Sequence, residues 1–229
     1  MKPGQLLTKW WQDYVAGGLT TPQDLHRASR AENPDKIEDR FTSVPVQGIS
    51  WDAPKRLAAP HFLTSEVYAR QGMRADWQHV PANLQRWAAM LVNTARTKGV
   101  PLYIHCAFRT EAEQAQLRKR GVSKVGYPRS AHNIGEAVDI VHSLYHWELT
   151  PSEWSYIHHL GQDCLRRLNA ALPKAQRLHL NWGGNDGTSQ DTFKWDPAHW
   201  EVTDYRERIK RLPVGVPIHK SPTTILKLR

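Results

Sequence analysis

Thiols, long apolar runs and acidic residues are all scarce in this sequence of 229 residues. The two cysteines, Cys106 and Cys164, lie far apart and in no Cys-x-x-Cys pair, which indicates neither a disulfide framework nor a thiolate zinc knuckle. No segment approaches the roughly 18 apolar residues that a membrane helix requires. Near the start, Lys9, Gln12 and Asp13 interrupt every apolar run before it reaches the length of a signal peptide. We therefore expect synthesis in the cytoplasm and no membrane span.

The shortage of acids leaves a strongly basic chain. Lysine and arginine number 31 against 22 acids, which gives a net charge of +9. Such a surplus predicts an anionic partner but does not choose among nucleic acid, an envelope polymer and a membrane surface. The tail at 204–229 has seven basic residues and two acids, so it contributes more than half of the surplus. We expect this tail to attract anionic envelope polymers.

The pattern of apolar and capping residues predicts one main domain at 61–203. It lies between an N-terminal extension at 1–60, helical or irregular, and the basic C-terminal tail at 204–229. Helices are expected where apolar residues recur at helical spacing (81–99) and where capping boxes begin at Thr110 and Thr150. Strands are expected at 100–108, 176–182 and 199–202. Strands interleaved with helices and hairpin-like returns favour an α+β fold, with a small, mostly antiparallel sheet and flanking helices.

The stretch RSAHNIGEAVDIV at 129–141 combines a histidine and an aspartate around a glycine. Fully extended chain would separate His132 from Asp139 by roughly 23 Å, so a shared role requires a fold between them. Gly135 and Glu136 fit a two-residue hairpin turn, which would set His132 opposite Asp139. Imidazole and carboxylate are both ordinary zinc ligands. The same pair also fits a plain His–Asp hydrogen bond across the hairpin.

A third ligand would favour the metal, and His199 in KWDPAHWEV is the best candidate. Asp196 and Pro197 favour a turn that carries the Asp196 carboxylate beside the His199 ring. Two histidines and one carboxylate leave a fourth tetrahedral position for water, as in catalytic zinc sites. Asp196 would then accept a proton from that water.

Three segments, in this order, resemble the M15 family of zinc peptidases. SAHNIGEAVD matches the signature SxHxxGxAxD, AFRTEAEQ is similar to an arginine-containing segment before it, and NWGGNDGTSQDTFKWDPAHWEV is similar to the segment that ends in the last histidine. The family contains the D-alanyl-D-alanine carboxypeptidases and L-alanyl-D-glutamate endopeptidases of peptidoglycan, with a Hedgehog-like fold. The match covers about 101–202 and departs from the family at Trp200, usually phenylalanine, and in a longer loop before Phe193.

The resemblance implies a role for each matched residue. His132, Asp139 and His199 become ligands of Zn²⁺, Asp196 the general base, and Arg109 the residue that binds the scissile carbonyl or a substrate carboxylate. Substrate contacts are also expected from three residues: Ser130, Gln114 and Trp200. Ser130 alternatively supports the ligand hairpin, Gln114 alternatively lies on a solvated helix face, and tryptophans here alternatively pack in the core. Glu201 either orients a ligand ring or is a charge at a strand edge.

These features predict a zinc peptidase that cuts peptidoglycan stem peptides. The implied setting is a phage lysin, made in the host cytoplasm and acting on the cell wall, either as an endolysin or carried in the virion beside phage structural proteins. Two alternatives stay open: a non-catalytic zinc-containing component of a phage particle, and a basic nucleic-acid-binding protein. An intact Asp196 argues against the first, and the absence of a recognition motif or a basic reading helix argues against the second.

Overall fold

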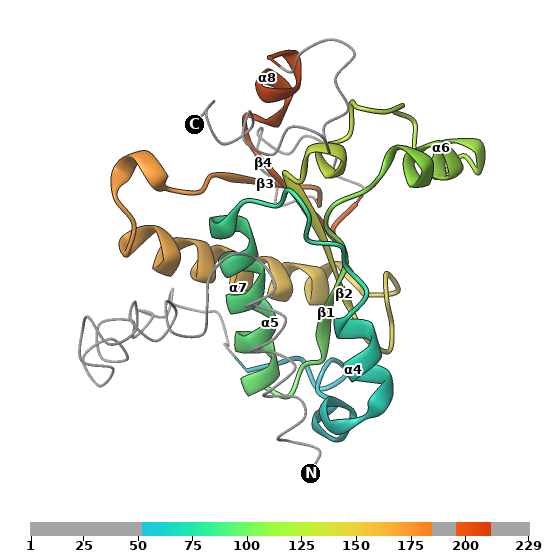
Figure 1. The fold of residues 1–229 in the computed structure, drawn as a ribbon. Helices are drawn as coiled ribbons and strands as arrows, with labels where there is room; N and C mark the ends of the chain where they lie inside the picture. Colours follow the sequence, from blue (N-terminus) through green and yellow to red (C-terminus); the bar gives the residue numbers. More distant parts are fainter. Residues whose placement is uncertain (1–51, 185–195, 212–229) are drawn as a thin grey trace.

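The computed structural model describes residues 52–184 and 196–211. Figure 1 shows a small sheet with helices around it. The strands are β1 (Leu102–Cys106), β2 (Ala137–His142), β3 (Leu180–Trp182) and β4 (His199–Val202). The helices are α4 (Glu66–Gly72), α5 (Ala82–Thr97), α6 (Glu111–Lys119), α7 (Pro151–Ala170) and α8 (Tyr205–Lys210). Short 3-10 turns occur at η1 (Pro60–Thr64), η2 (Ala131–Ile134) and η3 (Lys174–Gln176).

The four strands form one antiparallel sheet in the order β1-β2-β4-β3. The long connection from β1 to β2 contains α6 and η2, and α7 lies between β2 and β3. The sheet is therefore small, antiparallel and flanked by helices, which confirms the predicted α+β class. None of the helices within 52–184 and 196–211 is long and apolar enough to cross a membrane.

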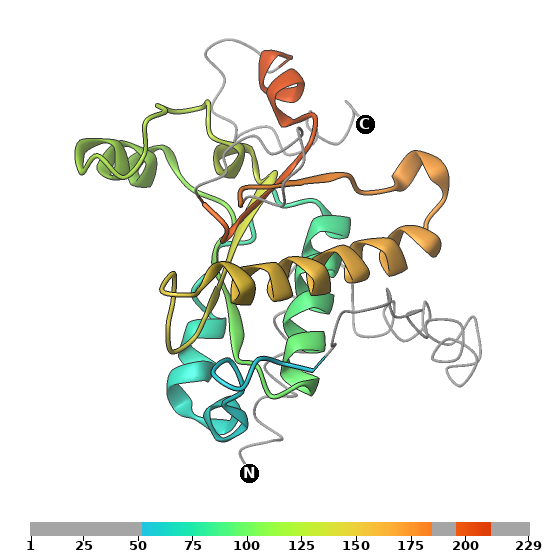
Figure 2. The ribbon, with the colours of Figure 1, turned by 180° about the vertical axis from the view of Figure 1, so that it is seen from behind.

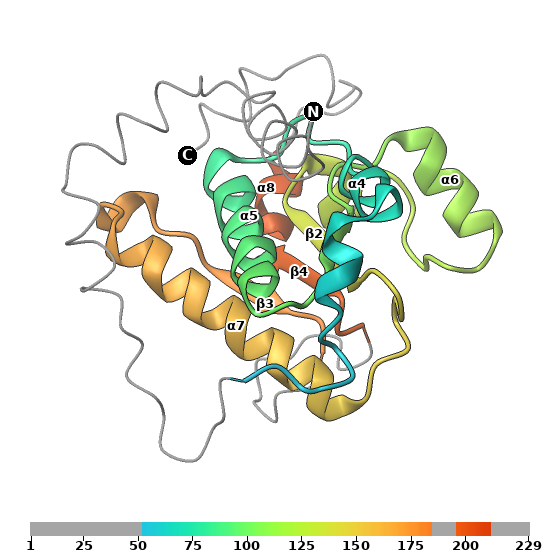
Figure 3. The ribbon, with the colours of Figure 1, turned by 90° about the horizontal axis from the view of Figure 1, so that it is seen from below.

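Helices α5 and α7 cover one face of the sheet (Figures 2 and 3). Every residue of the stripe predicted at 81–99 is buried: Leu84, Trp87, Ala88, Leu91 and Val92. Trp87 of α5 contacts Trp200 of β4 with ring centroids 4.9 Å apart. A Cβ at Gly161 of α7 would lie 2.8 Å from the Trp200 ring, so this close approach requires glycine. The core is thus a layer of aromatic and aliphatic side chains between the sheet and two helices.

Both predicted capping boxes are present. Thr110 and Glu113 cap α6, and Thr150 and Glu153 cap α7, each with the threonine side chain accepting from the glutamate N–H. Glu153 has a second role, because Arg56 donates to it at 2.6 Å. Reciprocal caps satisfy N–H groups that a helix start otherwise leaves unpaired.

The edges of the predicted domain take part in the packing where they are described. Leu57, before the predicted boundary at 60, is fully buried in the core. Beyond the boundary at 203, Tyr205 is buried and Arg208 pairs with fully buried Glu136 at 2.6 Å. The rest of both extensions, at 1–51 and 212–229, lies outside the described residues, as does the polar loop at 185–195.

Candidate metal centre

The segment that carries His132 is not the hairpin that the sequence predicts. Residues 131–134 form the 3-10 turn η2, and Gly135 ends it with φ at 73°. Asp139 pairs in the sheet with Cys106 of β1 and His199 of β4. The positive φ of glycine suits both structures, but β2 already has a partner strand on each side, so no place remains for a hairpin strand. A Cβ at Gly135 would also collide with the His79 carbonyl.

The turn η2 is nevertheless fixed so that His132 reaches Asp139. The Arg109 N–H donates to the His132 carbonyl at 3.0 Å, and the Asn133 amide donates to the Arg109 carbonyl at 2.9 Å. The Ser130 N–H donates to the Asn133 side chain at 3.3 Å. Ser130 therefore belongs to the framework of the turn, which is the supporting role expected as one of its two interpretations.

Three ligand-type atoms converge beside the sheet. His132 Nε2 lies 3.1 Å from Asp139 Oδ1, His199 Nδ1 lies 2.9 Å from the same oxygen, and the two nitrogens are 3.2 Å apart. Neighbouring ligands of a tetrahedral zinc ion with bonds of about 2.0–2.1 Å are separated by about 3.3 Å. All three residues are buried. The sequence therefore identified three residues that the fold does bring together, although it placed them by the wrong local structure.

In each histidine ring, one nitrogen faces Asp139 (the inner nitrogen) and the other faces away from it (the outer nitrogen). Both outer nitrogens already have a hydrogen-bond partner. His132 Nδ1 lies 2.8 Å from the Ala107 carbonyl, and His199 Nε2 lies 3.2 Å from the buried Glu201 carboxylate. Both partners only accept, so each ring donates its outer N–H. In the neutral rings the inner nitrogens then carry lone pairs, and these face an aspartate oxygen. Such a donor set fits a divalent metal ion, with Ala107 and Glu201 fixing the ring orientations.

Charge in the cluster also favours a cation. Burial lowers the pKa of His132, but the Asp139 carboxylate outweighs it and raises that pKa to about 10. His199 follows the same pattern, since burial is outweighed by hydrogen bonds to Asp139 and Glu201, and its pKa rises to about 8. Burial raises the pKa of Asp139, but His132 and His199 hold it well below its usual range. The site therefore retains positive charge, as protons or as a metal ion.

Asp196 stands beside this cluster. Its carboxylate lies within 4.8 Å of ligand atoms of Asp139 and His199. The turn predicted at Asp196 and Pro197 is present, because the His199 N–H donates to the Asp196 carbonyl at 3.0 Å. Burial and the negative charge of Asp139 raise the pKa of Asp196 above its usual value. A half-buried carboxylate with a raised pKa, next to a metal-type cluster, has the character of a proton acceptor.

Arg109 approaches the carboxylate oxygen of Asp139 that the two histidines do not contact. Its Nη2 is 3.7 Å from Asp139 Oδ2, and its Nη1 donates to Gln114 at 3.1 Å. Gln114 is fully buried and also donates to the Ser123 hydroxyl at 2.8 Å and the Val125 carbonyl at 2.7 Å. The solvated position considered for Gln114 is therefore wrong, because the loop after α6 folds back over this side chain. Gln114 holds Arg109 in place.

Trp200 is a correction to the predicted substrate contacts. Its side chain is fully buried against Trp87, on the face of β4 opposite to its neighbours His199 and Glu201. Adjacent residues of a strand point to opposite faces. Trp200 is therefore a core residue. Glu201 is buried in a central strand, so it is the ring-orienting residue considered from the sequence and not an edge charge.

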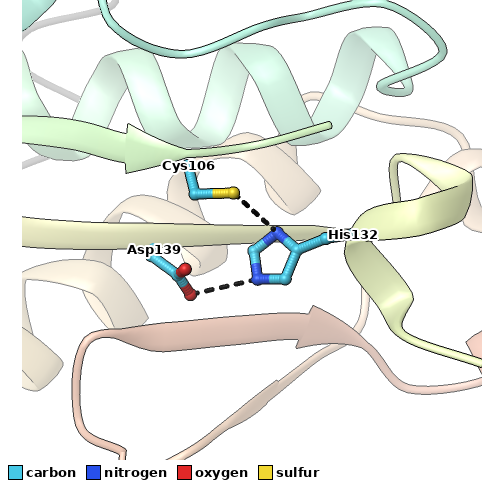
Figure 4. Close-up of side chains that lie close together, drawn as sticks. All are labelled: Cys106, His132 and Asp139. Carbon is cyan, nitrogen blue, oxygen red and sulfur yellow. Dashed lines mark hydrogen bonds and ion pairs between the residues drawn. The ribbon is translucent and has the colours of Figure 1, made fainter. Parts of the chain in front are cut away.

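Cys106 was not foreseen at this site. Figure 4 shows Cys106 and Asp139 next to different nitrogens of the His132 ring. The thiol sulfur is 3.6 Å from His132 Nδ1 and 3.5 Å from Arg109 Nη2. Cys106, His132 and Asp139 form a second group with metal-ligand spacing. The set of His132, Asp139 and His199 is the better metal site for two reasons. Its ligand atoms are closer together, and His132 Nδ1, the nitrogen next to Cys106, is already bound to the Ala107 carbonyl. The only signal in the sequence was the position of Cys106 three residues before Arg109.

No protein-family model and no curated protein matches the chain. Among solved structures, the chain is similar to the crystal structure of Serratia marcescens L-Ala D-Glu endopeptidase ChiX. The identity is 23%, the match covers 61% of this chain and 92% of that chain, and the TM-score is 0.42.

Proposed function

We propose that this chain is a zinc-dependent peptidase that hydrolyses peptide bonds in the stem peptides of peptidoglycan. One observation carries the proposal: the inner nitrogens of His132 and His199 meet Asp139 Oδ1 at 2.9–3.2 Å, while both outer nitrogens are bound to acceptors. A carboxylate and a guanidinium, from Asp196 and Arg109, flank this cluster.

Each residue of the site has a separate role in amide hydrolysis. His132, Asp139 and His199 would hold zinc, which supplies Lewis-acid chemistry by lowering the pKa of water and polarising a carbonyl. Asp196 takes a proton from the attacking water and returns it to the leaving amine. Arg109, held by Gln114, donates to the carbonyl oxygen as negative charge develops there. The burial of the cluster strengthens each of these electrostatic interactions.

The substrate class comes from the three sequence segments that resemble the M15 peptidases. The bond would be L-alanyl-D-glutamate or D-alanyl-D-alanine. The setting that we propose is a phage lysin, made in the host cytoplasm and acting on the wall as an endolysin or as part of the virion. The net charge of +9 supports attraction to an anionic envelope.

The decisive experiment is mass analysis of muropeptides after incubation with purified peptidoglycan. We expect one zinc ion per chain, new peptide-cleaved products, and loss of both in His132→Ala and His199→Ala. His179→Ala is the matched control, because His179 is exposed. Full activity in metal-free protein, or no cleavage by zinc-loaded protein, would refute the proposal.

A non-catalytic zinc site is the second candidate, and Cys106 is the observation that favours it. A thiolate at metal-ligand spacing from His132 and Asp139 could close a coordination sphere, as in structural sites. Cys106→Ser separates the two functions. A structural site would lose zinc affinity and stability in this variant, whereas the peptidase would keep its zinc.

A further inference from the structure

The backbone of Glu136 joins the turn η2 to strand β4. Its N–H donates to the Ala131 carbonyl at 2.9 Å, a bond that closes a helical turn ending at a left-handed glycine and so fixes the turn that carries His132. Its carbonyl accepts from the Val202 N–H at 2.8 Å, at the end of the strand that begins with His199. One residue therefore connects the segments that carry the two histidines of the candidate metal centre.

The side chain of Glu136 is fully buried and takes part in an ion pair. Arg208 of α8 donates to its carboxylate through Nη1 at 2.6 Å. The other two guanidinium nitrogens contact Asp204 at the start of the same helix, Nε at 3.1 Å and Nη2 at 2.9 Å. Arg208 is thus held in one orientation, in which it supplies positive charge to a carboxylate that would be costly to bury without it.

Apolar contacts attach α8 to the same turn. A small buried cluster contains Ala131 and Ile134 of η2, Ala137 of β2 and Tyr205 of α8, and Ile209 of α8 packs against it. This cluster is separate from the core beneath α5 and α7. The helix beyond the predicted domain boundary is therefore bound to the ligand-carrying turn by an ion pair and by apolar packing.

We propose that Arg208 is a positioning residue, which acts through Glu136 to hold His132 in the metal centre. The inference rests on the proposed function for the identity of the metal only. Without the arginine, the Glu136 carboxylate would lose this cation and move toward water, because removing one partner of a buried ion pair is strongly unfavourable. That movement would loosen the backbone between η2 and β4. Metal sites require ligands within about 0.5 Å of their working positions, so zinc affinity should fall.

The first measurement is the zinc affinity of the folded protein, by competition with a chromophoric chelator. Arg208→Gln should bind zinc about tenfold or more weakly than wild type, since partners outside the coordination sphere typically contribute about 10–100-fold. Arg208→Lys keeps the charge without the planar fork and should lie between the two. Glu136→Gln in the Arg208→Gln background removes the buried charge and should restore most of the affinity.

Arg56→Gln is the matched control. Arg56 also pairs with a buried glutamate at 2.6 Å, but that residue is Glu153 at the start of α7. Both substitutions should lower the free energy of unfolding, whereas only Arg208→Gln should lower zinc affinity. Wild-type affinity in Arg208→Gln, equal loss in Arg56→Gln, or no recovery in the double variant would each overturn the proposal. If Arg208→Gln does not fold, Arg208→Lys and the double variant carry the same comparison.

A second readout does not require zinc. In the metal-free protein, hydrogen exchange at the N–H groups of Gly135 and Glu136 should quicken about tenfold or more in Arg208→Gln, relative to the N–H groups of α5. Arg56→Gln should leave this ratio at its wild-type value. An unchanged ratio in Arg208→Gln would refute the link between α8 and η2. If the wild type binds no zinc, the proposed function fails, and this ratio alone decides whether Arg208 holds the turn.

Discussion

The two faces of the four-stranded sheet are made by alternate residues of the same strands, yet they have opposite chemistry. On the core face, Val138 pairs with Trp200, and Trp200 pairs with Trp182. The next residue of β2 belongs to the other face, where Asp139 pairs with both His199 and Cys106. The first face is apolar and covered by α5 and α7, whereas the second carries the candidate metal centre.

Both faces are buried where these strands pair. The outer face of a sheet in a two-layer fold is usually solvated. Here Asp139, His199 and Glu201 are 8%, 9% and 1% exposed. Burying ionisable groups is costly unless they are paired or bind a metal. Burial of apolar side chains stabilises the fold and so accounts for the core face. It does not account for the buried polar groups on the opposite face of the sheet.

The largest effect on the rate of hydrolysis is expected at Asp196. This residue lies beside the polar face but is not one of the three residues in the tight cluster. Asp196→Asn keeps the size and the turn, so zinc content and thermal stability should stay near wild type. Loss of a general base typically costs about 10²–10⁴ in rate. Zinc stoichiometry and peptidoglycan hydrolysis measure the two quantities.

The control for this experiment is Asp139→Asn, which replaces a carboxylate ligand by a poorer neutral one and should release zinc. Wild-type turnover in Asp196→Asn, or equal zinc loss in both variants, would contradict the division of the two aspartates into ligand and base.

On the core face, Trp200→Ala should reduce the free energy of unfolding by about 3–5 kcal/mol, because it leaves a cavity between Trp87 and α7. Denaturant unfolding measures this loss. Zinc affinity of the folded fraction should change little, since the side chain points away from the cluster. Val122→Ala is the control: its side chain is 60% exposed, so the change should stay within about 0.5 kcal/mol. Strong zinc loss in folded Trp200→Ala would show that the two faces are not independent.

A smaller effect is expected for Glu201→Gln, which weakens the acceptor for His199 Nε2. Residues that orient a ligand ring typically contribute about 10–100-fold to metal affinity. Competition with a chromophoric chelator measures this change. Glu207→Gln is the control, because Glu207 is exposed and its partner is Lys210 on the same helix. An unchanged affinity in Glu201→Gln would remove Glu201 from the site.

The smallest effect is expected in the basic tail. Arg208 is excluded from this test because it pairs with buried Glu136 and belongs to the fold. Replacing Arg206, Lys210 and Arg211 by glutamine should weaken binding to purified cell walls several-fold, and more at low salt, because exposed charges are screened. Turnover of a soluble stem peptide should not change. Equal weakening by the same substitutions at Arg86, Lys98 and Arg177 would indicate a general charge effect.

Local patterns predicted those features that depend on near neighbours in the chain. The helix at 82–97 follows from apolar spacing, and the two caps follow from a threonine and a glutamate three residues apart. Gln114 shows where such reasoning fails. Its own helix is polar, but the loop at 121–130 returns over it and Arg109 donates to it, so the side chain is buried.

His132 shows the same limit inside the site. The glycine at 135 and the spacing to Asp139 are compatible with a hairpin and with a capped 3-10 turn. The choice depends on β1 and β4, which occupy the two edges of β2. Pairing between strands that are distant in sequence cannot be read from a single segment, because each ladder hydrogen bond needs a partner from another part of the chain.

The sequence by itself determined the ligand types, the alternation of His199, Trp200 and Glu201 along one strand, and the turn that brings Asp196 to His199. Only the tertiary structure decided which nitrogen of each ring faces the cluster, because the Ala107 carbonyl and the Glu201 carboxylate take the other nitrogen. It also decided that Gln114 holds Arg109. Residue identity fixes what a side chain can donate or accept, whereas its partner and its burial depend on packing between segments far apart in the chain.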